Sequence, residues 1–248
     1  MQATKLNHRL SRRIALLKNV PLFAELSAAD LTTLVDDFQL KRYDPDEIIF
    51  HQGDSSHELY VILTGKVRIF KTSPSGNETS LQIFSSHDII GEFAAIDARP
   101  RSATVKAIVA SDLLVMPGDK FLQHMRAIPD LALAMTQLLV RKLRWTAAFA
   151  EAVVQYDCAG RLLHILLLYN EQFGEEQEAG KRYLLDLSMN QADLASLVGA
   201  RREWVNRILR DWRQRGLIEY DAGRLTILDL PRVEAERDSR IEACVEAW

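Results

Sequence analysis

The alternation of apolar and polar positions indicates short β-strands from residue 22 to about residue 117. Runs rich in β-branched and aromatic residues, Glu47–Phe50, Leu59–Leu63 and Lys66–Phe70, are separated by turn-forming pairs such as Gly-Asp and Thr-Gly and by a Pro-Ser-Gly-Asn stretch. No long helical pattern interrupts these runs. Strands at this spacing predict an antiparallel β-sandwich or β-roll.

Beyond residue 119 the apolar period becomes that of a helix. From Pro129 to about Tyr156 the chain contains neither glycine nor a further proline, and proline suits a first helical position. One apolar stripe occupies positions 128, 131, 135 and 138, and a second, with heptad spacing, comprises Leu139, Leu143, Thr146, Ala150 and Val153. We predict that residues 128–156 form a long dimerisation helix. The alternative is a helix that buries both stripes within one chain.

The C-terminal third has the pattern of a small domain with helices and a β-hairpin. Asp157 is suited to cap a helix and marks an expected hinge after the long helix. The expected elements that follow are a helix over Arg161–Tyr169, a polar surface connection over Glu171–Lys181, a strand over Tyr183–Leu187, a helix over Gln191–Val198 capped by Ser188, and a hairpin over Ile218–Leu228. The tail from Pro231 to Trp248 is charged and helix-prone.

The composition narrows the class of protein. With 48% hydrophobic residues the chain can form packed cores, and its net charge of −3 and isoelectric point of about 6.1 give no chain-wide signature of nucleic-acid binding. Any basic surface must therefore be local. The two cysteines, Cys158 and Cys244, are too few for a disulfide framework or for a four-cysteine iron–sulfur sensor. This low cysteine count fits a reducing cytosol.

Several other classes are disfavoured by what the sequence lacks. No segment approaches the ~20 consecutive apolar residues of a membrane span, and residues 1–18 form a basic amphipathic pattern rather than a signal peptide. We therefore expect a cytoplasmic protein without membrane association. No nucleophile–base pair or metal-ligand spacing is evident, so neither an enzyme nor a metal site is expected. His51, His57 and His87 fall in or between strands and are interpreted as surface or structural residues, not haem ligands.

The segment Gly91–Thr104 contains the groups that a cyclic nucleotide requires. Such a ligand presents a singly charged phosphate and a ribose 2′-hydroxyl. Arg101 has the fork geometry for the phosphate, Ser102 can donate a further hydrogen bond, and Glu92 can accept one from the hydroxyl. Gly91 lets the backbone approach closely. The segment therefore predicts a phosphate-binding cassette.

The residues around this cassette decide between a ligand site and a simpler interpretation. A short helix over Glu92–Ile96 would direct its N-terminus at the phosphate. Phe93 belongs to this helix and is also a candidate site residue. The simpler interpretation is that Glu92 and Arg101 form an ordinary surface salt bridge. The preceding glycine, Pro100, the Ser-Ala pair and the strand context favour the ligand site.

A second motif, near residue 200, has the pattern of a DNA-reading helix-turn-helix. An apolar stripe at helical spacing comprises Val205, Ile208, Leu209 and Trp212. On a different face lie Arg202, Glu203 and Arg207, and in the major groove arginine pairs with guanine while glutamate accepts from cytosine. The stretch Gln191–Val198 fits the supporting helix, and Gly199 fits the tight turn.

This motif also supplies the local positive charge that the whole chain lacks. Between residues 201 and 215 six arginines (201, 202, 207, 210, 213 and 215) stand against Glu203 and Asp211. The alternative is an ordinary solvated, arginine-rich helix. The glycine at the turn, the Arg-Arg-Glu…Arg set and the hairpin that follows favour a recognition helix with a wing.

Taken in this order, the two motifs closely resemble the bacterial superfamily of the cyclic-AMP receptor protein and the fumarate–nitrate regulator, in particular the cyclic-AMP receptor branch. The resemblance covers roughly residues 20 to 230. It implies a homodimer along the long helix, in which ligand places two winged helix-turn-helix domains one DNA turn apart, ~34 Å, on an inverted repeat of duplex DNA. It also implies a contact with RNA polymerase.

Matched residue by residue, the resemblance implies two sites. The cyclic-nucleotide positions are Gly91, Glu92, Phe93, Arg101, Ser102 and Thr146, the last where the family's long helix touches the adenine. The DNA-binding positions are Arg201, Arg202, Glu203 and Arg207. Cyclic AMP is the favoured effector, cyclic GMP is less favoured, and no metal is implied.

Three positions depart from the family pattern. Ala147 stands where the receptor protein has a serine that reaches the base across the dimer, which puts base selectivity in doubt. Arg201 occupies the usual serine or threonine cap position, so the recognition helix lacks a cap typically worth ~1 kcal/mol. Trp204 replaces a small hydroxyl residue that contacts phosphate.

The expected fold is α+β. Its expected parts are an N-terminal helical segment (1–21), an antiparallel cyclic-nucleotide-binding β-roll (22–127), a long dimerisation helix (128–156), a winged helix-turn-helix domain (157–230) and a C-terminal helical tail (231–248). Two alternatives stay open. One is a regulator of the same fold that responds to another ligand or to none, and the other is a cyclic-nucleotide module that gates a protein partner without binding DNA.

Overall fold

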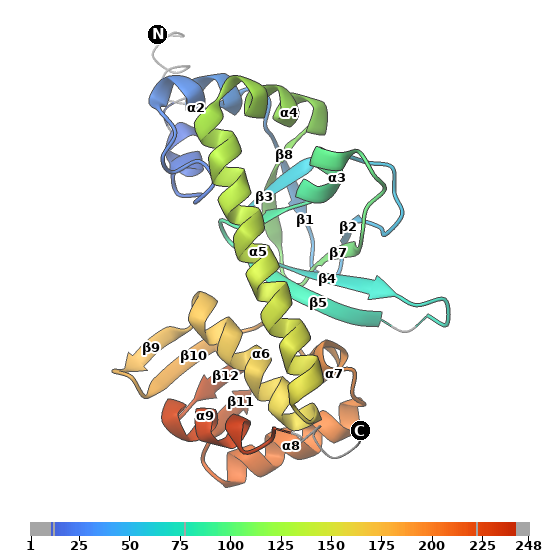
Figure 1. Ribbon diagram of the computed structural model, residues 1–248, viewed down its shortest axis with the longest axis vertical. Coiled ribbons are helices and arrows are strands. Elements are labelled where there is room, and N and C mark those ends of the chain that lie inside the picture. The colour runs from blue at the N-terminus through green and yellow to red at the C-terminus, as the bar shows by residue number, and fades with distance from the viewer. Residues whose placement is uncertain (1–10, 12, 77, 222, 242–248) are drawn as a thin grey trace, which may run out of the picture. The chain divides into compact units, whose positions relative to one another are not determined.

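The computed structural model describes residues 11, 13–76, 78–221 and 223–241. The chain divides into two compact units, Met1–Arg141 and Lys142–Trp248. The division falls within a single long helix, α5 (Pro129–Gln155), which contributes residues to both units (Figure 1). Among the described residues, none of the helices combines the length and the hydrophobicity that a bilayer span requires.

The first unit is built on two four-stranded antiparallel sheets, as the strand pattern predicted. The sheet orders are β1-β8-β3-β6 and β2-β7-β4-β5. In chain order the strands are β1 (Gln39–Tyr43), β2 (Ile48–Phe50), β3 (Leu59–Thr64), β4 (Lys66–Thr72), β5 (Glu78–Ser85), β6 (Ile89–Ile90), β7 (Thr104–Ala107) and β8 (Ser111–Met116). Apolar side chains of both sheets, including Phe50, Ile62, Val105 and Leu113, form one buried cluster, so the two sheets pack face to face.

Helices pack against this roll. They are α2 (Ala28–Val35), α3 (Glu92–Asp97), α4 (Gly118–Ala127) and the first half of α5. A second core cluster joins buried residues of α2, α4 and α5, and it includes Leu17 and Val20. Of the expected N-terminal helical segment, residue 11 and residues 13–18 are helical, and residues 1–10 and 12 lie outside the described residues.

The helix α2 was not predicted, and the expectation of strands throughout residues 22–117 was wrong there. Ser27 caps the helix, because its Oγ accepts a hydrogen bond from the backbone N–H of Asp30. Leu31, Leu34 and Val35 fall at helical spacing and are buried. A helix of 8 residues offers only one such repeat, too short a pattern to stand out between strands.

The two stripes of α5 differ in burial. Ile128, Leu131, Met135 and Leu138, the first stripe, are buried in the core of the first unit. Along the second stripe Leu139 is half-buried, whereas Leu143 is 68% exposed and Val153 is exposed. Val140 and Val154 add to the exposed apolar residues of the helix. The helix therefore carries an apolar surface that the described part of the chain leaves exposed.

The second unit contains the expected helix-turn-helix and hairpin. Its elements are α6 (Cys158–Phe173), β9 (Glu175–Glu178), β10 (Arg182–Asp186), α7 (Gln191–Val198), α8 (Arg202–Gln214), β11 (Ile218–Asp221), β12 (Arg224–Ile227) and α9 (Leu230–Asp238). The strands form one antiparallel sheet in the order β11-β12-β10-β9. Asp157 caps α6 as predicted, since its carboxylate accepts from the backbone N–H of Gly160 at 2.7 Å.

Two local expectations in this unit were wrong. The segment Glu171–Lys181 is not simply a connection, because it contains the end of α6 and the strand β9. The cap of α7 is Asn190 rather than Ser188. Asn190 forms a capping box with Asp193, whereas Ser188 adopts a positive φ and its hydroxyl donates to Asp186.

Candidate functional site

The candidate ligand cassette begins at a tight turn between β6 and α3. Gly91 has a φ of +79°, a conformation that side-chain-bearing residues rarely adopt. A Cβ at this position would stand 2.7 Å from Nη1 of Arg101 and 2.8 Å from the carbonyl oxygen of Glu58. Glycine is therefore required both by the backbone conformation and by the close approach of the arginine.

The guanidinium of Arg101 is enclosed and held by three acceptors. The residue is only 3% exposed. Its Nε donates to Oγ of Ser56 at 2.9 Å, Nη1 donates to the carbonyl oxygen of Gly91 at 3.0 Å, and Nη2 donates to the carboxylate of Glu58 at 3.1 Å. The arginine therefore has a fixed direction, as a bidentate anion-binding group requires.

Two aromatic rings surround the same guanidinium. Its central carbon lies 4.2 Å from the centroid of Phe50 and 5.6 Å from that of Tyr60. Burial lowers the pKa of Arg101, and the neighbouring Tyr60 and Glu58 oppose this effect. Burial also raises the pKa of the Tyr60 hydroxyl, which stays neutral. Since arginine keeps its proton even when buried, the site contains a fixed positive charge beside apolar ring faces.

The other predicted ligand residues differ in burial. Glu92 opens α3 and is buried. Ser102 and Phe93 are exposed. The alternative of a surface salt bridge between Glu92 and Arg101 is contradicted, because both residues are buried and the ion pair of Arg101 is made with Glu58.

Glu58 and Ser56 were missed by the sequence analysis. Together with Tyr60 they alternate along the approach to β3 and into it, so their side chains point to one side of the strand. Each of the three contacts or faces Arg101. The alternation of polar and aromatic residues at 56, 58 and 60 was the available signal, but nothing in the sequence indicates which strand faces the arginine.

The remaining predicted ligand residue, Thr146, belongs to the second unit. It is exposed on α5, and its hydroxyl donates to the carbonyl oxygen of Lys142 at 2.9 Å. Its role in ligand binding remains a prediction. Among the described residues, no group of three or more His, Cys, Asp and Glu side chains could hold a metal ion.

The recognition helix α8 has one buried and one exposed side. Val205, Leu209 and Trp212 are buried, as predicted, and Ile208 is half-buried. The predicted DNA-binding residues Arg201, Arg202, Glu203 and Arg207 are all exposed. Gly199 ends α7 with a φ of +68°, so the turn between the two helices requires its conformational freedom.

The start and the end of α8 differ from a simple arginine-rich helix. Arg201 is the N-cap residue and makes no side-chain cap hydrogen bond, as its sequence position predicted. At the other end, Arg215 is engaged by Asp211 at 3.2 Å and by Glu236. Besides Arg215, residues 201–215 include five exposed arginines: 201, 202, 207, 210 and 213.

Comparisons with known proteins match both halves of the chain. Residues 40–127 match the cyclic nucleotide-binding domain family, and residues 160–236 match the Crp-like helix-turn-helix domain family. A CRP-like cAMP-activated global transcriptional regulator of Mycobacterium tuberculosis is 28% identical over 88% of this chain and 96% of its own. The cyclic AMP receptor protein of Thermus thermophilus is also 28% identical, over 88% of this chain and 97% of its own.

A solved structure shares the fold at lower sequence identity. The c-di-GMP-responsive global regulator CLP of Xanthomonas campestris superposes with a TM-score of 0.68 at 21% identity, and the match covers 82% of this chain and 99% of that one. The two domain types follow one another along this chain and are joined by one long helix. The chain therefore belongs to the superfamily of the cyclic-AMP receptor protein and the fumarate–nitrate regulator, which are DNA-binding transcription regulators with a cyclic nucleotide-binding domain.

Proposed function

We propose that this protein is a homodimeric transcription regulator that binds cyclic AMP in preference to cyclic GMP and reads an inverted-repeat operator. The observation that carries the ligand part is the buried, fully oriented guanidinium of Arg101 beside the Gly91 turn. An arginine fork matches a phosphate in shape as well as in charge. Two relatives have cyclic AMP in their names, which supports this choice of ligand.

The proposed contacts follow from the chemistry of the ligand. Arg101 binds the cyclic phosphate, with Ser102 as a further hydroxyl donor. Glu92 accepts a hydrogen bond from the ribose 2′-hydroxyl, and Phe93 borders the site. Thr146 contacts the adenine, an assignment that rests on the resemblance alone. Because Ala147 has no hydroxyl, we expect weaker discrimination between bases than a serine would give.

The proposed dimer forms through α5. Leu143 is 68% exposed, and Val140, Val153 and Val154 are exposed on the same helix. A run of large apolar residues at helical spacing on an exposed surface is typical of a helix–helix interface between two copies. A second copy of the same helix would cover this surface with equally apolar residues.

The proposed DNA contacts come from the first turns of α8. Arg202 and Arg207 are exposed and suited to guanine, and Glu203 is suited to cytosine. Arg201 and the other exposed arginines are suited to phosphate. A homodimer presents two such helices, so the operator is an inverted repeat with half-sites one DNA turn apart, ~34 Å. Such a regulator acts in the cytoplasm, where it meets the chromosome and RNA polymerase.

The proposed mechanism is a shift between two arrangements of the dimer. Of the two arrangements, ligand binds more tightly to the one in which both α8 helices fit the operator. Ligand therefore increases the population of that arrangement. The size of the response is set by the difference in ligand affinity between the two arrangements.

Calorimetric titration of the full chain with cyclic AMP and, separately, with cyclic GMP tests the ligand. We expect micromolar binding of cyclic AMP and weaker binding of cyclic GMP. Arg101→Ala should abolish binding, while Arg99→Ala, a neighbouring arginine whose side chain is 84% exposed, should retain it. Unchanged affinity in Arg101→Ala would remove the assignment of the pocket.

A second candidate is a regulator of the same fold with another effector. Ala147 and the carboxylate of Glu58 on Arg101 favour this alternative, because one removes a base contact and the other already neutralises the arginine. A structural relative described as c-di-GMP-responsive shows that the fold is compatible with a different nucleotide. Failure of both cyclic mononucleotides to bind, with DNA binding intact, would select this alternative.

A further inference from the structure

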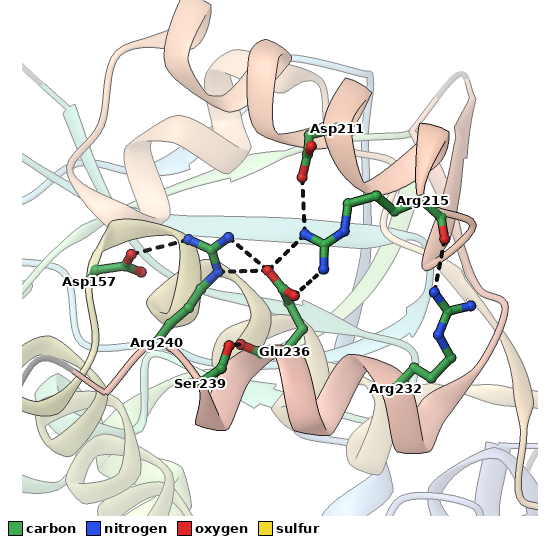
Figure 2. Close-up of polar contacts among 7 residues, drawn as sticks. All are labelled: Asp157, Asp211, Arg215, Arg232, Glu236, Ser239 and Arg240. Carbon is green, nitrogen blue, oxygen red and sulfur yellow. Dashed lines mark hydrogen bonds and ion pairs between the residues drawn. The ribbon is translucent and has the colours of Figure 1, made fainter.

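A carboxylate on the C-terminal helix α9 joins two arginines from different parts of the second unit. The side chain of Glu236 is only 10% exposed. Its Oε1 accepts from Nη1 of Arg215 at 3.0 Å and from Nη2 and Nε of Arg240 at 2.7 and 2.9 Å (Figure 2). Its Oε2 accepts from Nη2 of Arg215. Glu236 is therefore the centre of a charge-assisted network rather than a member of an isolated surface pair.

One arm of the network holds the end of the recognition helix. Arg215 is the C-cap residue of α8, and Asp211 on the last turn of the same helix also pairs with it, at 3.2 Å. Arg232 on α9 donates to the carbonyl oxygen of Arg215 at 3.0 Å (Figure 2). Residues of α9 thus bind both the side chain and the backbone of Arg215.

The other arm reaches the junction between α5 and α6. Nη1 of Arg240 donates to the carboxylate of Asp157 at 3.2 Å, and the backbone N–H of Asp157 donates to the carbonyl oxygen of Arg240 at 3.1 Å. Tyr156 and Ile241 form an antiparallel bridge beside these contacts. A Cβ on Gly160 would stand 2.8 Å from Cβ of Arg240, so the chain after α9 packs closely on the start of α6.

The geometry of α8 makes the position of its anchored end important for DNA reading. The helix has 13 residues and is therefore about 20 Å long. A tilt of about 5° at the anchored end moves the first turn, with Arg202 and Glu203, by almost 2 Å. Hydrogen bonds to base edges tolerate a few tenths of an ångström, whereas contacts of long side chains with phosphate depend less on such positioning.

We propose that Glu236 is a specificity-determining residue for DNA reading, which acts by fixing the orientation of α8 through Arg215 and through the Arg240–Asp157 arm. This inference rests on the proposed reading of bases by α8 and is independent of which ligand binds. Loss of the carboxylate should reduce binding to the operator far more than binding to unrelated DNA. Glu236 does not touch DNA in this proposal.

Glu236→Gln in the full chain tests the proposal. Duplexes enriched by the wild-type protein from a random pool serve as the operator, and a random duplex of equal length serves as the reference. We expect at least a tenfold loss of affinity for the operator and no more than a twofold change for the reference. Glu234→Gln is the matched control, because Glu234 lies on the same helix, is exposed and is not part of the network.

Further measurements separate this effect from loss of folding. The described tryptophans, 145, 204 and 212, belong to the second unit, and Trp248 lies outside the described residues, so tryptophan fluorescence reports the unfolding of that unit. Arg240→Gln, which leaves the pair of Glu236 with Arg215 in place, should show a smaller loss of the same selective kind. If Glu236→Gln fails to fold, Arg240→Gln alone decides.

The outcomes distinguish this proposal from the proposed function. An equal loss on the operator and on the reference duplex, or behaviour like that of Glu234→Gln, would overturn the role of Glu236 while leaving DNA reading intact. If the wild-type protein enriches no duplex from the pool, the reading of bases by α8 fails, and the specificity role of Glu236 fails with it.

Discussion

Replacing Gly91 by alanine tests whether the turn at the candidate pocket is shaped by its contact with Arg101. The substitution introduces two costs. An alanine at a φ of +79° pays the strain of the left-handed region, about 1 kcal/mol or slightly more. Its Cβ would also stand 2.7 Å from Nη1 of Arg101, so the buried guanidinium must move and give up its bond to the carbonyl oxygen of Gly91. Disturbing a buried charged hydrogen bond costs about 1–3 kcal/mol.

The chain offers a matched control for the strain. Gly76, in the turn between β4 and β5, has a φ of +83°, and a Cβ there meets no described atom within 4 Å. Gly76→Ala should therefore cost about 1 kcal/mol of unfolding free energy, and Gly91→Ala about 2–4 kcal/mol. Urea unfolding followed by circular dichroism measures both values, since the tryptophans report only the second unit.

Ligand affinity gives the second measurement on these variants. We expect Gly91→Ala to bind cyclic AMP at least tenfold more weakly in a calorimetric titration, because Arg101 no longer has its direction. Gly76→Ala should bind like the wild-type protein. Equal destabilisation by the two substitutions, with unchanged affinity in Gly91→Ala, would refute the argument that close packing against Arg101 shapes the site.

Four further predictions concern single side chains. Glu58→Gln should strengthen cyclic-AMP binding several-fold in calorimetry, because the competing carboxylate on Arg101 is removed; weaker binding would mean that Glu58 positions the arginine instead. Hydrogen bonds from Arg215, and further ones from Arg240, lower the pKa of Glu236 to about 2, below its ordinary value of 4.5. This lowered pKa supplies stability on the order of 2 kcal/mol, which is present above pH 4.5 and is lost as the pH falls through 2. The free energy of unfolding, followed by fluorescence, should therefore fall less with acid in Glu236→Gln than in the wild-type protein. Arg202→Ala should cost about 1–3 kcal/mol on the operator and relax its sequence preference in a binding selection; an equal loss on random DNA would exclude base reading. Leu143→Glu should dissociate the dimer in sedimentation, whereas Leu40→Glu, at a residue that is 61% exposed on β1, should leave it intact.

Periodicity and glycine positions predicted most of the fold. The antiparallel strands, the long helix that begins at Pro129 and the two helices around Gly199 follow from local patterns that tertiary structure reinforced. The helix Ala28–Val35 was missed because its pattern is only two turns long. Ser188 was predicted as the cap where the structure has Asn190, because both residue types cap helices and sequence alone does not fix which of two nearby polar residues starts a helix.

The candidate sites were predictable only where their residues lie close together in the sequence. Gly91, Glu92 and Arg101 lie within one short segment, and the structure places the glycine against the arginine. The partnership of Arg101 with Glu58 joins residues 43 positions apart, and that of Arg215 with Glu236 joins residues 21 positions apart. Such pairs depend on how strands and helices pack, which a single sequence does not encode in any local pattern.

The cap position of the recognition helix connects DNA affinity with the salt content of the cell. Arg201 gives up a side-chain cap worth ~1 kcal/mol and adds an exposed cation at the end of α8 that carries the proposed base-reading residues. Each cation that neutralises a DNA phosphate makes binding more sensitive to ionic strength. Serine or aspartate at this position would favour a sturdier helix with weaker and less salt-sensitive binding. Substitutions at position 201 would thus change the stability of the recognition helix and the salt dependence of DNA binding in opposite directions.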